Sequence, residues 1–249
     1  MFDGGWRRLL KIIAALVAVL LTVQVSASDV EGVRSIATKL LAALESPERG
    51  ELGMVAITID DSPAIYPRRV NNGIAVSQAY VEFMDKMAKA LATDRIAPGY
   101  LKEFGDRLAN FDGNQPLPDL PPTAGVKTES LDWQNAVATY FNHLVGNSLS
   151  IEYAHLYLGQ YASHQKQLNN TNAIPLHLVL SDGEWQKALK NGVTNSSRSG
   201  FGITGLPEFY EFIESLNPRP AWSIAYFPPK AKAAKLQKEL TALHDKALR

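Results

Sequence analysis

The strongest constraint on the fold of this chain is the segment from Leu149 to Gln167, whose composition and spacing predict a helix. Glu152 and His155 are three residues apart in this segment, and a helix places residues at that spacing on one face. Ile151, an apolar residue, directly precedes Glu152. A carboxylate and an imidazole one turn apart can transfer protons or bind a metal ion. This helix is therefore the first candidate for a functional site.

Hydrophobic periodicity predicts helices over most of the remaining chain. Apolar residues recur every three or four positions in several segments, whereas short runs rich in β-branched residues predict strands. The predicted helices cover residues 29–44, 78–92, 98–108, 129–145, 206–216 and 230–248, and a further helix follows the capping pair Ser181-Asp182. The predicted strands are 54–59 and 74–77, with 173–180 and 221–227 as further extended candidates. The pattern favours a mainly helical α+β fold with a small sheet.

Two features along the chain interrupt these elements. Gly146-Asn147-Ser148 is predicted to break the helical pattern and to separate residues 129–145 from 149–167. Residues 111–123 contain four prolines together with Asp, Asn and Gly, which is typical of an extended surface loop. The sequence leaves open whether this loop is a lid or a spacer.

The N-terminus has the charged, apolar and small segments of a secretory signal, in that order. Arg7, Arg8 and Lys11 precede an apolar run over residues 12–25, and Ala27 supplies a small residue at the expected cleavage position. We therefore expect residues 1–27 to be a signal peptide, residues 28–249 to form a single domain, and the protein to be exported, to a bacterial periplasm. A retained membrane anchor is the alternative, although the apolar run is shorter than the roughly 20 residues that a span needs.

Composition narrows the classes of protein further. The chain has no Cys, so an exported form has no disulfides and depends on packing, for which its hydrophobic fraction of 46% is sufficient. Lys+Arg and Asp+Glu both number 25, so the net charge is zero and no nucleic-acid partner is expected. No segment after the N-terminal run is long and apolar enough to predict a stable membrane span.

The string from Ile151 to Gln160 is similar to a metallopeptidase motif. In H-E-x-x-H, two His residues one turn apart bind zinc and the Glu between them polarises water. Glu152, Ala154, His155 and Leu158-Gly159 occupy positions of the phrase His-Glu-Leu-Ala-His-x-x-Leu-Gly-His. Together with the preceding strand phrase from Val70 to Ser77, the chain resembles the HtpX/Ste24-like gluzincin zinc metallopeptidases over roughly residues 57–159. The resemblance implies a zincin-like fold with a small antiparallel sheet beside the motif helix.

The chain departs from that family at ligand positions. Ile151 stands where the first zinc-binding His is expected, and Gln160 replaces the His that often closes the phrase. The resemblance implies a third ligand from a Glu on a later helix, and the candidates are Glu184, Glu208 and Glu211. A rebuilt zinc site would combine His155 with His143 and one of these carboxylates, with Glu152 as the catalytic base. With the ligand set incomplete, we expect no cofactor, or zinc if the protein is active.

Each of these residues also has an ordinary structural explanation. Glu152 can be a solvent-facing helix residue or one held by a hydrogen bond, and His155 can be a core histidine with satisfied ring nitrogens. Tyr153, Tyr157 and Tyr161 recur every four residues. They can pack in the core, or Tyr153 and Tyr157 can form an aromatic wall that binds a ligand.

Three functional hypotheses follow. The first is an exported, catalytically degenerate metallopeptidase-like protein that binds a peptide, polymer or protein partner in the former cleft. The second is an active zinc metallopeptidase with rearranged ligands. The third is a periplasmic structural or assembly factor without a ligand site. The missing zinc ligand at Ile151 favours the first hypothesis over an enzyme.

Overall fold

The structure is a computed structural model that describes residues 30–249, except for 53–54, 71–72, 114, 124 and 169–174. The predicted signal peptide and its cleavage position lie outside the described residues. The α-helices are α2 (Val30–Ala43), α3 (Ser46–Leu52), α4 (Gln78–Asp94), α5 (Tyr100–Leu108), α6 (Leu131–Tyr157), α7 (Gln160–Ser163), α8 (Asp182–Arg198), α9 (Leu206–Ser215) and α10 (Ala233–Ala247). The mainly helical α+β class predicted from the sequence is confirmed.

A small mixed sheet accompanies these helices. Its strands are β1 (Ala56–Asp60), β2 (Arg68–Val70) and β3 (Gly73–Ser77), in the order β1-β3-β2. β3 pairs parallel with β1 and antiparallel with β2, so the prediction of an antiparallel sheet was wrong in part. The closeness of β1 and β3 explains Gly73, because a Cβ there would lie 2.2 Å from the carbonyl oxygen of Ala56.

Helix α6 is the central element, and it is longer than predicted. It runs without interruption through Gly146-Asn147-Ser148, so the predicted break was wrong. Phe201 packs directly on Gly146 and leaves no room for a side chain there, because an added Cβ would lie 2.8 Å from the Phe201 ring. The Asn147 amide donates to the carbonyl oxygens of His143 (2.8 Å) and Gly202 (2.9 Å). Tertiary contacts, rather than a turn, account for these two residues.

Two extended candidates are 3-10 helices instead. η1 covers Leu176–Leu178 and η2 covers Ala221–Ala225. Each follows a proline, Pro175 or Pro220, whose fixed φ suits the entry to a tight helical turn. The two short helices lie side by side, so they bring residues near 177 close to residues near 224.

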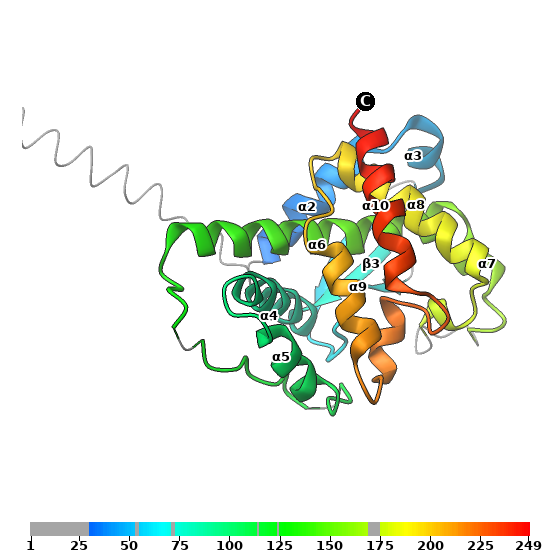
Figure 1. Cartoon of the computed structure of the whole chain (residues 1–249). Coiled ribbons are helices and arrows are strands. Elements are labelled where there is room, and N and C mark those ends of the chain that lie inside the picture. The colour runs from blue at the N-terminus through cyan, green and yellow to red at the C-terminus, as the bar shows by residue number, and fades with distance from the viewer. Residues whose placement is uncertain (1–29, 53–54, 71–72, 114, 124, 169–174) are drawn as a thin grey trace, which may run out of the picture.

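The core forms where α6 packs against α4 on one side and α8 on the other (Figure 1). Gly192 of α8 allows close approach, because a Cβ there would lie 2.7 Å from the Cα of Ile151. A second layer of aromatic side chains from α9 and η2 packs on α4, with Phe83 and Trp222 in an edge-to-face pair. All five residues of β3 are buried.

The proline-rich loop is tied to the helices beneath it. Lys86 donates to the carbonyl oxygen of Pro118 (3.0 Å), and Tyr100 donates to that of Pro121 (2.6 Å). The indole of Trp222 donates to the carbonyl oxygen of Phe111 at the start of the loop (3.0 Å). These contacts from three separate elements fit a spacer better than a lid.

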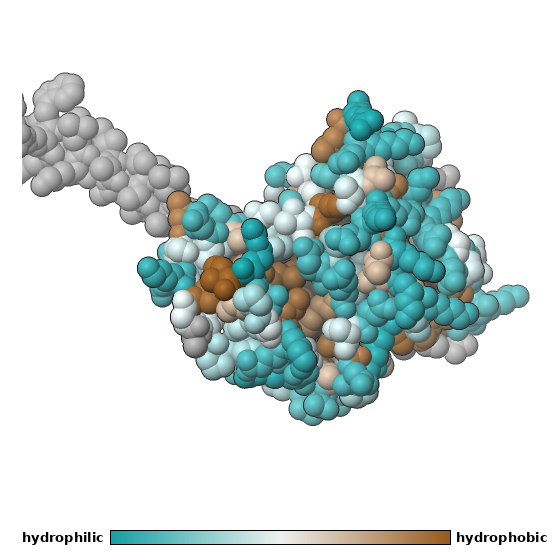
Figure 2. Space-filling view, viewed as in Figure 1, coloured by the Kyte–Doolittle hydropathy of each residue, from teal (hydrophilic) through white to brown (hydrophobic). Residues whose placement is uncertain are grey.

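The surface is mostly hydrophilic on the face shown in Figure 2, with apolar side chains gathered where the start of α6 meets α4. Leu131 is 70% exposed and Ile96 is 58% exposed at these ends. Within the described residues, no helix has both the length and the apolar character needed to cross a membrane.

Candidate functional site

The end of α6 positions the residues of the motif. Gly159 adopts a left-handed conformation (φ 67°), which ends the helix and turns the chain into α7. Gln160 and Tyr161 therefore fold back beside Glu152 and His155 instead of continuing along the helix. All four side chains are buried.

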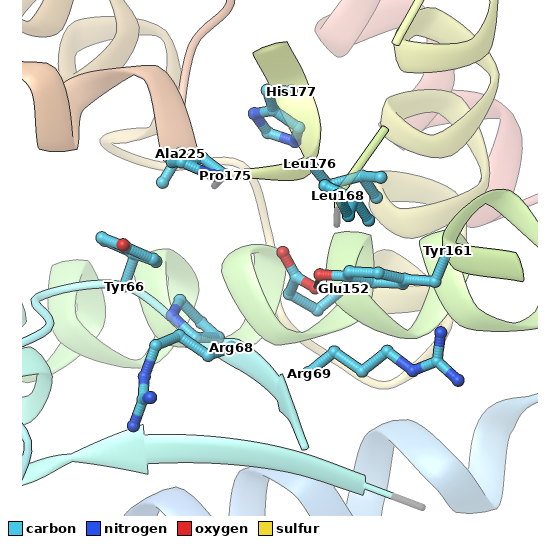
Figure 3. Close-up of a pocket in the computed structure, with 11 residues that line it drawn as sticks. Tyr66, Arg68, Arg69, Glu152, Tyr161, Leu168, Pro175, Leu176, His177 and Ala225 are labelled. Carbon is cyan, nitrogen blue, oxygen red and sulfur yellow. Dashed lines mark hydrogen bonds between the residues drawn. The ribbon is translucent and has the colours of Figure 1, made fainter. Parts of the chain in front are cut away.

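Glu152 and Tyr161 form a buried pair. The Tyr161 hydroxyl donates to Oε2 of Glu152 at 2.7 Å. Burial raises the pKa of Glu152 to about 7, although the hydrogen bond from Tyr161 opposes this shift. Figure 3 shows the two side chains facing each other, with Arg69 from β2 close to the ring of Tyr161. The Arg69 guanidinium lies 5.2 Å from the centre of that ring.

Two small adjoining cavities border Glu152. Both are lined by Glu152, His177, Pro67 and Ala225; the first extends toward Arg68, Arg69 and Tyr161, and the second toward apolar side chains of α6 and α9. Each has a volume of about 20 Å³. That space holds about one water molecule, so neither cavity admits a side chain without movement.

His155 lies in a chain of buried polar groups. Its Nδ1 is 2.6 Å from Oε1 of Gln160, and its Nε2 is 3.0 Å from Nε2 of His177. This series of hydrogen-bonded groups ends at a backbone carbonyl oxygen on both sides. Nε2 of Gln160 donates to the carbonyl oxygen of Glu184 at 2.9 Å, and Nδ1 of His177 lies 3.0 Å from the carbonyl oxygen of Ile224. Burial lowers the pKa of His155 to about 4 and that of His177 to about 3.

The other predicted ligands lie elsewhere. Glu184 is the third residue of α8 and forms a capping box with Ser181, and it pairs with His164 at 2.9 Å. The hydrogen bonds from Ser181 and then His164 lower its pKa to about 2. The side chain of His143 lies against Gly202, since a Cβ on that glycine would meet its ring at 3.0 Å. Glu208 is in the first turn of α9 and Glu211 is exposed on the same helix.

These positions do not assemble the predicted zinc site. His143 cannot approach His155 across a turn at Gly146, because α6 is continuous there. Ile151 packs against Gly192 and borders the apolar cavity. Within the described ranges, no group of three or more His, Cys, Asp or Glu side chains is placed to hold a metal ion.

The two tyrosines predicted to bind a ligand differ in burial. Tyr153 is fully buried and lines neither of the cavities beside Glu152. Tyr157, the middle member of the stripe, is partly exposed. Tyr161, the third member of the stripe, is the one that reaches the site.

Sequence reasoning missed His177, Arg68 and Arg69. His177 is 22 positions from His155 and follows a segment with no clear secondary-structure pattern, so no spacing rule connects the two. Arg68 and Arg69 lie in a strand of three residues, which is too short for an alternating pattern to be detected. The nearby Pro175 and Pro67 were visible signals of turns but not of a site.

Comparisons of this chain with protein-family models, with curated proteins and with solved structures find no match. The geometry of the chain is therefore the basis for a functional proposal.

Proposed function

We propose that this protein is an exported, catalytically degenerate metallopeptidase-like protein that binds an extended segment of a peptide or protein partner along β2. The observation that carries this proposal is the position of β2, an edge strand whose Arg68 and Arg69 line the cavity that contains Glu152. Among the described residues, β2 pairs only with β3. An edge strand can accept a further strand through its backbone groups.

The size of the cavity determines how such a partner would lie. About 20 Å³ is too little for a peptide side chain, so the partner would run across the mouth and leave the cavity to solvent. Tyr66 and Arg69 line this cavity and would supply aromatic and cationic contacts for side chains on one face of the added strand. The added backbone hydrogen bonds would provide affinity, and these side chains would provide selectivity.

Amide hydrogen exchange tests this proposal. The purified protein is screened against a library of extended peptides, and exchange is measured at Arg68–Val70 with and without a bound peptide. We expect protection of β2 amides, with no change in β1, whose opposite edge serves as the internal control. Protection of β1 instead of β2, or stoichiometric zinc together with peptidase activity, would contradict the proposal.

A second candidate, an active metallopeptidase with rearranged ligands, draws on one observation. Burial raises the pKa of Glu152 to about 7, near the value that suits a general base at neutral pH, beside a cavity with room for one water. Peptide hydrolysis that is abolished by Glu152→Gln would support this candidate. Equal, background-level hydrolysis by both proteins would leave the binding protein as the better description.

A further inference from the structure

The buried chain through His155 and His177 has a fixed hydrogen-bond direction at its first end. Nε2 of Gln160 lies 2.9 Å from the carbonyl oxygen of Glu184, which can only accept, so the amide nitrogen must donate to it. The amide oxygen of Gln160 then faces Nδ1 of His155 at 2.6 Å. An amide oxygen also only accepts, and His155 must therefore carry its proton on Nδ1.

The second end fixes the other histidine in the same way. Nδ1 of His177 lies 3.0 Å from the carbonyl oxygen of Ile224, so this nitrogen must also carry a proton. In a neutral imidazole, one ring nitrogen is a donor and the other is an acceptor. Both rings, when neutral, consequently present an Nε2 lone pair.

These two lone pairs face each other. The Nε2 atoms are 3.0 Å apart, and both histidines are buried. Two lone pairs cannot form a hydrogen bond, and buried acceptors without a donor are costly. A cation between the two nitrogens, either a proton or a metal ion, removes this conflict.

We propose that Nε2 of His155 and Nε2 of His177 bind one divalent transition-metal ion of the kind that imidazole prefers, with zinc as the probe. Zn–N bonds of about 2.0–2.1 Å in tetrahedral geometry place two ligand nitrogens about 3.3 Å apart, so the observed pair needs only a small adjustment. The site uses a histidine that the motif does not contain. It is independent of peptide binding at β2.

The surroundings of the two rings support this assignment. Histidines that bind metals usually donate their other ring N–H to a carbonyl or carboxylate oxygen, which fixes the ring and its tautomer. His177 does so to Ile224, and His155 does so to Gln160. The cavity of about 20 Å³ that His177 and Glu152 line offers space for a solvent ligand on the His177 side of the pair.

Metal titration of the purified protein tests the proposal. After removal of metal with a chelator, zinc is titrated by calorimetry, and cobalt is added in parallel to give a visible spectrum that reports its ligands. We expect one equivalent of zinc in the wild type, and at least a tenfold weaker affinity in His177→Gln and His155→Gln. Gln160→Leu, which removes the partner of His155, should weaken affinity about 10- to 100-fold.

A matched variant and a second measurement keep the test independent of folding. His164→Gln changes a partly buried histidine that pairs with Glu184 outside the proposed site, and it should bind zinc as the wild type does. In the wild type, nitrogen NMR of the two buried histidines should show their Nε2 signals shift on zinc addition. The proposal is overturned if no stoichiometric zinc binds, if both histidine variants keep full affinity, or if a proton remains on Nε2 when zinc is present.

Discussion

The two halves of α6 are buried in different ways. From Leu131 to Tyr140, only Val137 and Tyr140 are buried, nearly one turn apart, and the other residues are exposed or partly exposed, as in an ordinary amphipathic helix at the surface. From Leu144 to His155, every residue except Ser148 is buried. This second half includes the polar residues Asn147, Ser150, Glu152 and His155.

The polar residues of the second half have partners from distant parts of the chain. Asn147 reaches Gly202, Asn195 donates to Ser150 at 3.1 Å, Tyr161 donates to Glu152, and His155 meets His177. Burying polar groups is favourable only when they are bonded in this way. The first half of α6 therefore contributes mainly packing, with one side-chain hydrogen bond from Trp133 to Thr93, whereas the second half maintains a polar interior around the candidate site.

The largest effect should come from the ionisation of Glu152. Its pKa rises from 4.5 to about 7 on folding, a difference of 7 − 4.5 = 2.5 units. Because the folded state holds the proton more tightly, the stability that this group contributes is present below pH 4.5 and is lost as pH rises through 7. At 1.36 kcal/mol per unit, the loss is about 3 kcal/mol.

Glu152→Gln measures this effect. The stability advantage of the variant over the wild type should grow between pH 4.5 and 7 by up to about 3 kcal/mol, as followed by urea unfolding at several pH values. A difference that stays constant with pH would mean that Glu152 ionises as freely in the folded protein as in the unfolded chain. The contrast between the two halves of α6 would then be weaker.

Gly192→Ala should give the next largest effect. Its Cβ would lie 2.7 Å from the Cα of Ile151, so the backbones of α6 and α8 must separate. We expect a loss of about 2 kcal/mol in the free energy of unfolding, measured by urea denaturation. Gly183→Ala in the same helix is the matched control, because a Cβ there meets nothing within 4 Å. Equal effects of the two substitutions would show that α8 does not pack closely on the second half of α6.

Asn147→Ala should have a smaller effect. Asn147 is fully buried, and its substitution leaves the partly buried carbonyl oxygen of Gly202 without its donor, so stability should fall by about 1–2 kcal/mol. Asn191→Ala is the control, since its amide also donates to a carbonyl four residues earlier, but on an exposed surface of α8. Thermal unfolding of both variants would show whether burial separates them; a similar loss in both would attribute the effect to helix propensity.

Trp133→Phe, in the first half of α6, should have the smallest effect. It removes the hydrogen bond from the indole of Trp133, a residue that is only half-buried, to Oγ1 of Thr93 (3.2 Å), and it keeps an aromatic ring for packing. We expect a loss of about 0.5–1 kcal/mol by urea unfolding. A loss larger than that of Asn147→Ala would reverse the ranking of the two halves.

Local sequence signals predicted many elements well. The Ser181 cap predicted the start of α8, where the structure has a full capping box, and the apolar periodicity predicted α2, α4, α5 and α9 to within a few residues. These features succeed because caps and amphipathic patterns depend on residues within one or two turns. The placement of Glu152 and His155 together on one helix also followed the motif spacing, whereas the burial of Glu152 was not predicted.

The sequence by itself determined the class of fold, most of the helical segments and the helix that carries Glu152 and His155. Only the tertiary structure decided the parallel pairing of β1 with β3, the continuity of α6 through Gly146, and the meeting of His155 with His177. The physical reason is the distance along the sequence over which each kind of interaction acts. Gly146 signals a turn by its local propensity, but Phe201 makes it a packing residue, and no local rule can specify a contact between rings 22 positions apart.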